Sequence, residues 1–287
     1  MDFRLTDNQS ALRDLAARIF DDAVSDEGLR AFAAGGEPYD RAQWRTLAEA
    51  GLLGLAVSEE AGGLGLGMIE LGLLLEEQGR TLAPVPLTAT LALAAMALDR
   101  HGSAAQKAAW LPRVIAGEAI LTAAIEEVGG VDPARPATRA EAEGNGWRLT
   151  GTKIAVPYGV EAAAWIVTAA TPRGPALFLV DPAGPGITVE AQQSTSGEPQ
   201  AHIAFAGAAL AGDALVGGVE AGGAVVADVI ARGQVALAQR QVGVAAEALR
   251  RTALYSSGRV QFGKPLGMMQ AVQQRAADAF IDVEAMR

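Results

Sequence analysis

The chain has 287 residues, half of them hydrophobic, with a formal net charge of -10 and no cysteine. This composition predicts a globular protein with an ample core, and it excludes disulfides, thiolate metal sites and a cysteine nucleophile. Because an acidic chain repels a phosphate backbone, we expect no nucleic-acid partner.

The N-terminus opens directly into a helical pattern, which predicts no signal peptide. The longest apolar run, residues 87–98, is shorter than the roughly 20 residues that a bilayer requires. We therefore expect a cytoplasmic protein without a membrane span. The two histidines, His101 and His202, lack metal-ligand spacing, so we expect no metal site. We interpret them as a helix-end and a strand histidine rather than as catalytic bases.

Residues 1–118 read as a helical domain. Thr6 and Gln9 form a capping-box pattern before apolar residues at helical spacing, and Ser103 with Gln106 forms another. Further helices are predicted at 41–50, 68–80 and 88–98; in the helix at 68–80, the apolar residues from Ile69 onward are expected to be largely buried. The glycine-rich loop 59–67 lacks a preceding strand and a suitably placed lysine, so it predicts an interhelical turn rather than a phosphate cradle.

Residues 119–217 change to short strand-like runs separated by Gly, Pro and Asp. The predicted strands are 120–125, 147–154, 165–169, 176–180, 187–190 and 202–205. Strands at this spacing are typical of an antiparallel sandwich or barrel. We expect an α+β fold with a helical domain at 1–118, an antiparallel β domain at 119–217 and a helical domain at 218–287.

The C-terminal region contains one long helix from about 221 to 257 and a second that opens after Pro265. The helical period is still running at Arg287, and native helices rarely end without a cap. We therefore expect this domain to be incomplete and to continue beyond Arg287.

Several segments carry a family resemblance. Residues 258–266 read GRVQFGKPL, residues 146–153 read GWRLTGTK, and residues 59–65 read EEAGGLG. Together with the order of helical, β and helical domains, these segments resemble the acyl-CoA dehydrogenases over the whole chain. The resemblance implies FAD-dependent dehydrogenation of an acyl-CoA thioester to the enoyl-CoA, in β-oxidation of lipids or steroids. It also implies a tetramer that passes electrons to an electron-transfer flavoprotein.

The resemblance places the cofactor-binding residues in the C-terminal segment. Arg259 matches an arginine that contacts, across a subunit interface, the pyrophosphate of a flavin held mainly by the neighbouring chain. Gln261 and Phe262 line the same region, and Leu266 and Gln270 follow it. A guanidinium grips phosphate oxygens in a fixed fork, so the residue type suits the role. The alternative is an interhelical turn with a solvated arginine.

The loops that would hold the flavin ring differ from the family pattern. The family's Thr-Glu-Pro-x-Ala-Gly-Ser-Asp loop matches 125–132, where Ile125 and Val131 replace the threonine and the serine. The next loop, Trp-Ile-Thr/Ser-Asn, matches 155–158, where Ala155 replaces the covering aromatic and Pro157 the hydroxyl donor. Tyr158 is a partial substitute, shifted by one position. This loss of contacts within a retained frame resembles the degenerate subunit of actinobacterial heteromeric dehydrogenases that act on steroid side chains.

No catalytic base is visible. In the family a glutamate takes the α-proton, and it lies either near the C-terminus or on the long helix at a position that matches Gly233 here. The arginine that usually follows is Gln234. Asp228 and Glu247 are out of register and are interpreted as solvated or interface charges. We expect the base beyond Arg287 or in a partner chain.

Four hypotheses remain open. The chain is a subunit of a dehydrogenase that needs a partner chain, a conventional homotetrameric dehydrogenase, a non-catalytic assembly or CoA-thioester binding protein, or a flavin monooxygenase or nitroalkane oxidase on the same fold. The altered loops favour the first and third hypotheses over the second. The intact segment at 259–262 favours the first over the third, because a chain with no role at a flavin does not need a phosphate clamp.

Overall fold

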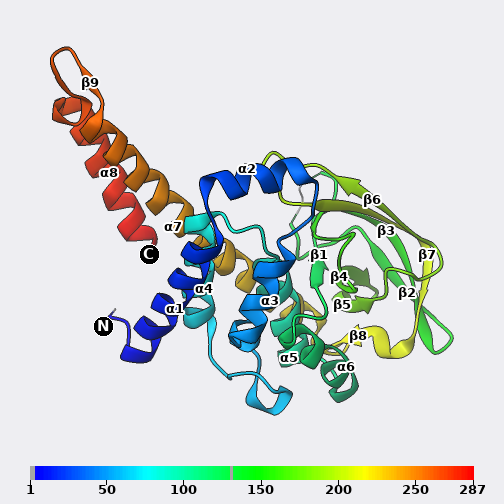
Figure 1. The fold of residues 1–287 in the computed structure, drawn as a ribbon. Coiled ribbons are helices and arrows are strands. Elements are labelled where there is room, and N and C mark those ends of the chain that lie inside the picture. The colour runs from blue at the N-terminus through cyan, green and yellow to red at the C-terminus, as the bar shows by residue number, and fades with distance from the viewer. Residues whose placement is uncertain (1–3, 130–131) are drawn as a thin grey trace. The chain divides into compact units, whose positions relative to one another are not determined.

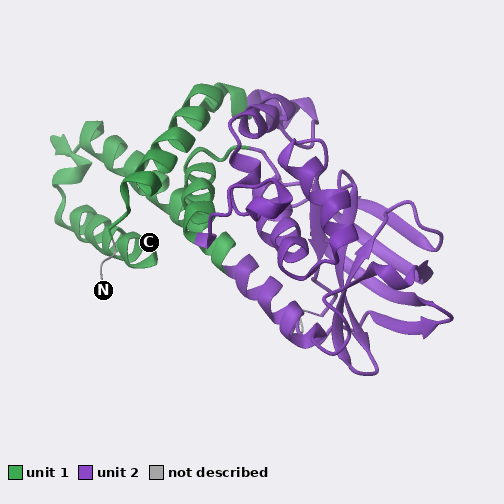
Figure 2. Ribbon diagram, turned by 90° about the horizontal axis from the view of Figure 1, so that it is seen from below, with its two compact units in different colours: residues 1–29, 69–83, 235–287 green, residues 30–68, 84–234 purple. Residues whose placement is uncertain are grey.

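The computed structural model describes residues 4–129 and 132–287 (Figure 1). The chain divides into two compact units, which Figure 2 shows in different colours. Unit 1 comprises Met1–Leu29, Ile69–Ala83 and Val235–Arg287, and unit 2 comprises Arg30–Met68 and Pro84–Gln234.

Unit 1 is helical. It contains α1 (Asp7–Ala23), the start of α2 (Asp26–Gly35), nearly all of α4 (Met68–Thr81), the second part of α7 (Gly222–Gly258) and α8 (Gln270–Met286). The predicted capping box at the start of α1 is confirmed, because Thr6 and Gln9 exchange side-chain-to-backbone hydrogen bonds. Ile69 is 63% exposed, so its predicted burial was wrong. It lies two positions before the buried Leu71, on the opposite side of a 3.6-residue turn.

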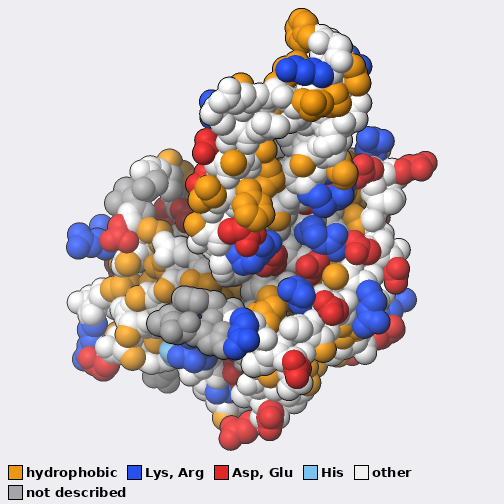
Figure 3. Space-filling model, turned by 90° about the vertical axis from the view of Figure 1, so that its left-hand side faces the viewer, with side chains coloured by type: hydrophobic (Ala, Val, Ile, Leu, Met, Phe, Trp, Pro, Cys, Tyr) orange, Lys and Arg blue, Asp and Glu red, His pale blue; other side chains and the backbone are white. Residues whose placement is uncertain are grey.

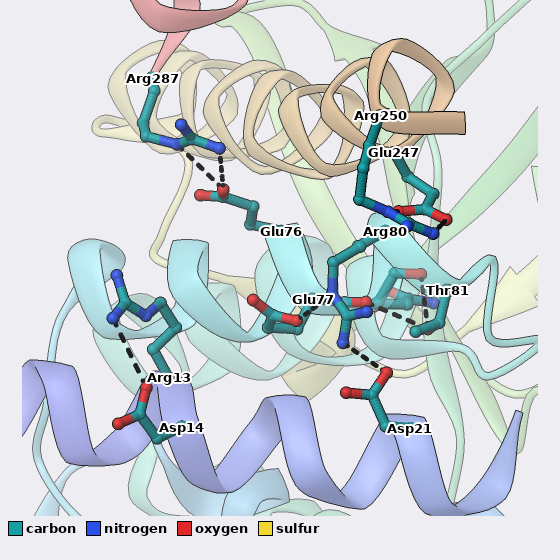
Figure 4. A network of polar contacts seen from close by, with 11 residues as sticks. Arg13, Asp14, Asp21, Glu76, Glu77, Arg80, Thr81, Glu247, Arg250 and Arg287 are labelled. Atoms are coloured by element: carbon teal, nitrogen blue, oxygen red, sulfur yellow. Dashed lines mark hydrogen bonds and ion pairs between the residues drawn. The ribbon is translucent and has the colours of Figure 1, made fainter. Parts of the chain in front are cut away.

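Charged residues link the helices of unit 1 (Figure 4). Arg80 on α4 lies 2.8 Å from the carboxylate of Asp21 on α1 and 2.6 Å from that of Glu77. Arg287 lies 2.8 Å from Glu76. Backbones approach closely as well, because a side chain at Gly79 would collide with the carbonyl group of residue 240 on α7. Small residues and paired charges therefore hold α1, α4 and α7 together.

Unit 1 also contains η5 (Leu266–Met268), and unit 2 contains the other helices. These are the end of α2, α3 (Arg41–Glu49), η1 (Leu52–Gly54), η2 (Glu59–Ala61), η3 (Thr88–Ala95), α5 (Met96–His101), α6 (Ala104–Ile115), η4 (Gly212–Ala214) and the first part of α7. The Ser103–Gln106 capping box at the start of α6 is confirmed. The single helix predicted at 88–98 is instead π-helical over Thr88–Ala95 and continues as α5.

The glycine-rich loop is an interhelical turn, as predicted. Its backbone N–H groups are used within the turn: Leu64 donates to the Gly54 carbonyl at 2.9 Å, and Gly65 donates to the Val57 carbonyl at 2.8 Å. A phosphate cradle needs N–H groups that point at a ligand. This loop therefore has a structural role.

The strands of unit 2 form one sheet. They are β1 (Leu121–Ala124), β2 (Arg139–Glu143), β3 (Gly146–Pro157), β4 (Ala164–Thr171), β5 (Gly174–Val180), β6 (Ile187–Gln192), β7 (Gln200–Leu210) and β8 (Leu215–Val216). Their order is β6-β7-β3-β2-β4-β5-β8, and β1 pairs with β4. Trp165, Phe178 and Leu149 are fully buried in its core.

The sheet differs from the prediction in its pairing and in two strands that were not predicted, β2 and β8. All six predicted strands are present, but β1 runs parallel to β4, so the sheet is mixed rather than antiparallel. The hairpin of β2 and β3 lies between them in sequence and provides the long connection that parallel neighbours need. Sequence patterning missed β2 because Ala140 is its only buried residue, which leaves no apolar alternation to detect.

Candidate functional site

The segment 258–266 forms a tight hairpin between α7 and α8 in unit 1. It consists of β9 (Val260–Gln261) and β10 (Lys264–Pro265). The Leu266 N–H donates to the Arg259 carbonyl at 2.9 Å and closes the hairpin. The two residues at its tip, Phe262 and Gly263, have φ values of 53° and 77°. Positive φ at both central positions is typical of the type I′ turns that join short hairpins, where Asn-Gly is the usual pair.

Phe262 is an unusual residue for this turn. A non-glycine residue held at positive φ costs on the order of 1 kcal/mol. Its ring is also 90% exposed, so no packing within unit 1 offsets that cost. Figure 3 shows exposed hydrophobic side chains at the top of the view, where Figure 1 places β9. A strained, exposed aromatic indicates a contact with another molecule.

Arg259 begins the hairpin with an exposed guanidinium. It makes no side-chain hydrogen bond or ion pair with any other residue among 4–129 and 132–287. Gln261 and Gln270 are also exposed, and Leu266 is half-buried. The structure therefore brings the five predicted cofactor-binding residues into one hairpin and the start of α8. An unpaired guanidinium on an exposed hairpin suits an external anion.

The two loops predicted at the flavin ring lie side by side in unit 2. The Ile154 N–H donates to the Glu126 carbonyl at 2.9 Å, and the Lys153 ammonium donates to the Ile125 carbonyl at 3.1 Å. Ile125 directly follows β1, whereas Ala155 and Pro157 lie at the end of β3. Val131 lies outside the described residues.

A buried ion pair fixes these loops. Lys153 is fully buried and donates to Glu127 at 2.7 Å and to the Thr168 hydroxyl at 2.9 Å. Burial lowers the pKa of Lys153, against the opposing effect of Glu127. Burial alone would raise the pKa of Glu127, but hydrogen bonds from Lys153 and from residues 137 and 138 hold it below its usual value. We did not predict this pair, whose signal is a lysine among the apolar residues of a strand.

Two backbone N–H groups of the loop at 155–158 donate to acceptors within unit 2. The Ala155 N–H donates to the side-chain oxygen of Gln192 at 2.8 Å. The Tyr158 N–H donates to the Pro199 carbonyl at 2.9 Å. The Tyr158 side chain is only 2% exposed, and its ring packs edge-on against Tyr39 with 6.5 Å between centroids. Tyr158 is thus packed in the core of unit 2, and its role as a partial substitute, shifted by one position, stays a prediction.

The position that matches the helix-borne base in the family is a buried glycine. Gly233 lies on α7, and a Cβ there would lie 2.6 Å from a terminal methyl group of Leu93. A longer side chain at this position would require the Leu93 side chain to move. This packing agrees with the absence of a base at this position.

Asp228 and Glu247 on α7 are partly buried in ion pairs rather than freely solvated, and their interpretation as interface charges stays a prediction. Asp228 lies 3.0 Å from Arg232 and 2.9 Å from His101. Burial opposes ionisation of Asp228, yet these partners lower its pKa to about 2. The Arg250 hydrogen bond is the main reason why the pKa of Glu247 falls to about 2. Carboxylates with such pKa values are weak bases at neutral pH.

Two further absences concern the residues that the structure describes. Among 4–129 and 132–287, no cluster of histidine, aspartate or glutamate could hold a metal ion. In the same residues, no helix is long and apolar enough to cross a bilayer.

Family models match consecutive parts of the chain. The N-terminal, middle and C-terminal domains of the acyl-CoA dehydrogenases match residues 6–118, 122–207 and 220–287. Acyl-CoA dehydrogenase FadE27 of Mycobacterium tuberculosis is 36% identical over 290 aligned residues, which cover 100% of this chain and 75% of the relative. Acyl-CoA dehydrogenase FadE28 of the same organism is 34% identical, with coverages of 98% and 74%.

Solved structures agree with these matches. A variant of the steroid ACAD Tcur3481-Tcur3483 superposes with a TM-score of 0.91 and 44% identity, over 98% of this chain and 75% of that one. The ChsE4-ChsE5 complex from Mycobacterium tuberculosis gives a TM-score of 0.92 and 36% identity, with coverages of 99% and 76%.

Proposed function

Because the chain belongs to the acyl-CoA dehydrogenase family of flavoprotein oxidoreductases, we propose that it is one subunit of an FAD-dependent dehydrogenase whose flavin site it shares with a related chain. The reaction would convert an acyl-CoA thioester to the enoyl-CoA, with FAD, when bound, as the source of a hydride acceptor. One contrast carries the proposal. Arg259 and Phe262 are exposed and unpaired, whereas the Ala155 and Tyr158 donors of the ring loop are already engaged.

The described residues fit one part of FAD and not the other. The unpaired guanidinium of Arg259 fits a pyrophosphate, because a charged fork binds phosphate oxygens with two parallel hydrogen bonds. The loops at Ile125 and 155–158 do not fit the ring. Ile125 has no hydroxyl, Pro157 has no N–H, and Tyr158 is buried. This chain would therefore contribute a phosphate contact, and its partner would hold the ring.

The same contrast defines what a partner chain must supply, and the similar structures support a substrate class. A partner chain must supply the ring-binding loops and the catalytic glutamate, since Gly233 lies against Leu93 and Asp228 and Glu247 are held as ion pairs. The similar structures include a steroid ACAD and a complex of two chains, which supports a steroid-type acyl-CoA substrate and a heterotetramer. An electron-transfer flavoprotein would accept the electrons.

The test is co-expression with a related dehydrogenase chain that has intact threonine and tryptophan loops. We expect the purified pair to retain FAD and to reduce a ferrocenium or dye acceptor with bulky acyl-CoAs. This chain alone should retain little FAD, because each lost hydrogen bond or ring contact is worth on the order of 1 kcal/mol.

Other outcomes separate the alternatives. Stoichiometric FAD and full activity in this chain alone would establish a conventional homotetrameric dehydrogenase. No flavin and no activity in any pairing would leave a non-catalytic assembly protein.

A further inference from the structure

A β-bulge interrupts β3 at the loop that fails to fit the flavin ring. Lys153 pairs with Ile203 and Val156 pairs with Ala201, so residues 154 and 155 together oppose the single residue 202. A two-against-one bulge disrupts the ladder and leaves its extra residue without a strand partner. The Ile154 N–H is satisfied by the Glu126 carbonyl. The Ala155 N–H is the donor that the bulge releases.

The group that accepts this donor comes from a strand that is not adjacent to β3. In the sheet order β6-β7-β3, Gln192 lies at the end of β6 and pairs with Gln200, which in turn pairs with Pro157. The Gln192 side chain therefore reaches across β7, since neighbouring strands lie about 4.8 Å apart. Its amide oxygen stands 2.8 Å from the Ala155 nitrogen. The next residue, Gln193, is exposed.

A released backbone donor is the kind of group that binds the acceptor edge of a planar heterocycle, because it points away from the ladder and carries no side-chain entropy cost. Residues 155, 157 and 158 offer no such donor here. Ala155 is engaged by Gln192, Pro157 has no N–H, and Tyr158 donates to Pro199. Ala155 also has a φ of 50°, a conformation that requires support from its surroundings.

We propose that the Gln192 side chain, by accepting the hydrogen bond of the Ala155 N–H, keeps this donor from a flavin ring. Gln192 thereby helps to exclude the ring from the 155–158 loop. The inference rests on the proposed function, in which a partner chain holds the ring. It adds that a specific side chain, Gln192, engages the free donor of the loop, in addition to the replacement of the family's contact residues at 155 and 157.

The first test is hydrogen–deuterium exchange of the peptide around residues 152–159 in the purified chain. Gln192→Leu keeps the side-chain volume and removes the acceptor, so the Ala155 amide should exchange about tenfold faster. Gln192→Glu keeps an acceptor oxygen and should preserve the slow exchange. Gln193→Leu is the matched control at the adjacent exposed position and should behave as wild type. Unchanged exchange in Gln192→Leu, or equal acceleration in Gln193→Leu, would overturn the proposal.

The second test measures FAD affinity by fluorescence quenching. A155W/P157T restores an aromatic and a hydroxyl to the loop, and Q192L is then added to it. We expect the triple variant to bind FAD at least about tenfold more tightly than the double variant, because only the triple variant offers the bulge donor. Equal affinity would remove the role of Gln192 in exclusion. It would leave the proposed function intact, since that function fails only if the wild-type chain holds flavin alone or no pairing holds it.

Discussion

The hairpin at 258–266 and the loop at 155–158 both contain non-glycine residues at positive φ. Neighbouring groups support these residues in the loop but not in the hairpin. Ala155 and Tyr158, with φ values of 50° and 51°, are held by Gln192, Pro199 and the Tyr39 ring. Phe262, with a φ of 53°, is 90% exposed. The chain itself offsets the strain at 155 and 158, whereas the strain at 262 is not offset by packing and would be offset by the proposed contact with another chain.

The charges show the same contrast. Lys153 is buried among three acceptors near the degenerate loops, whereas Arg259 has no side-chain partner in the described parts of the chain. A buried polar group must be paired because desolvation is costly, while an exposed guanidinium carries no such constraint. The ring loops thus have the properties of a packed core, and the hairpin has those of a binding surface. The following experiments test that difference.

The largest effect is expected at Lys153. Lys153→Met removes the ammonium and leaves the Glu127 carboxylate poorly solvated, so the free energy of unfolding should fall by about 3–5 kcal/mol. Urea denaturation of wild type and variant measures the change. Lys264→Met, on the exposed hairpin, is the control and should change stability by less than about 0.5 kcal/mol. Similar losses for both lysines would break the comparison.

The next effect concerns binding rather than stability. Arg259→Ala should weaken FAD retention in the assembled complex by about 1.5–3 kcal/mol, the value of a charge-assisted contact. Arg259→Lys keeps the charge but not the fork, so it should lose less. Flavin absorbance after dialysis reports retention, and urea denaturation should show no matching loss of stability. Full flavin content in the alanine variant would contradict the assignment.

A smaller effect is expected from the ion pairs on α7. The pKa of Asp228 is about 2 in the folded protein, against an ordinary value of 3.8. Ionised Asp228 therefore stabilises the fold fully at pH values above 3.8. Asp228→Asn should cost about 1–2 kcal/mol at pH 7, reduced by solvent screening. The difference from wild type should shrink as pH falls from about 4 towards 2, where Asp228 becomes protonated. Urea denaturation across this range measures it, and a difference that does not depend on pH would exclude ionisation as its cause.

The smallest effect is expected at the hairpin tip. Phe262→Asn places at positive φ a residue that tolerates it, so stability should rise by about 0.5–1 kcal/mol. Gly263→Ala, at a φ of 77°, should lower stability instead. If Phe262 serves a partner contact, the asparagine variant should also assemble less well with the partner chain, as measured by size-exclusion chromatography. A variant that is less stable and assembles normally would reverse our interpretation of the strain.

The sequence by itself determined the features that depend on local chemistry. The capping boxes at Thr6 and Ser103 were predictable because a capping side chain bonds a backbone group three residues away. The six strands were visible because short apolar runs bounded by Gly, Pro and Asp are typical of β-strands. The hairpin segment was visible as a contiguous motif, and the missing base at Gly233 followed from the residue type.

The tertiary structure decided what depends on residues distant in sequence. Lys153 meets Glu127 across 26 positions, Ala155 meets Gln192 across 37, and Asp228 meets His101 across 127. The same is true of the parallel pairing of β1 with β4 and of the burial of Tyr158 against Tyr39. Local pattern assigns a residue to a helix, strand or turn, but long-range packing selects the partner of each polar group. The sequence therefore predicted that the ring contacts are missing, and only the fold showed that Gln192 accepts the hydrogen bond of the Ala155 N–H.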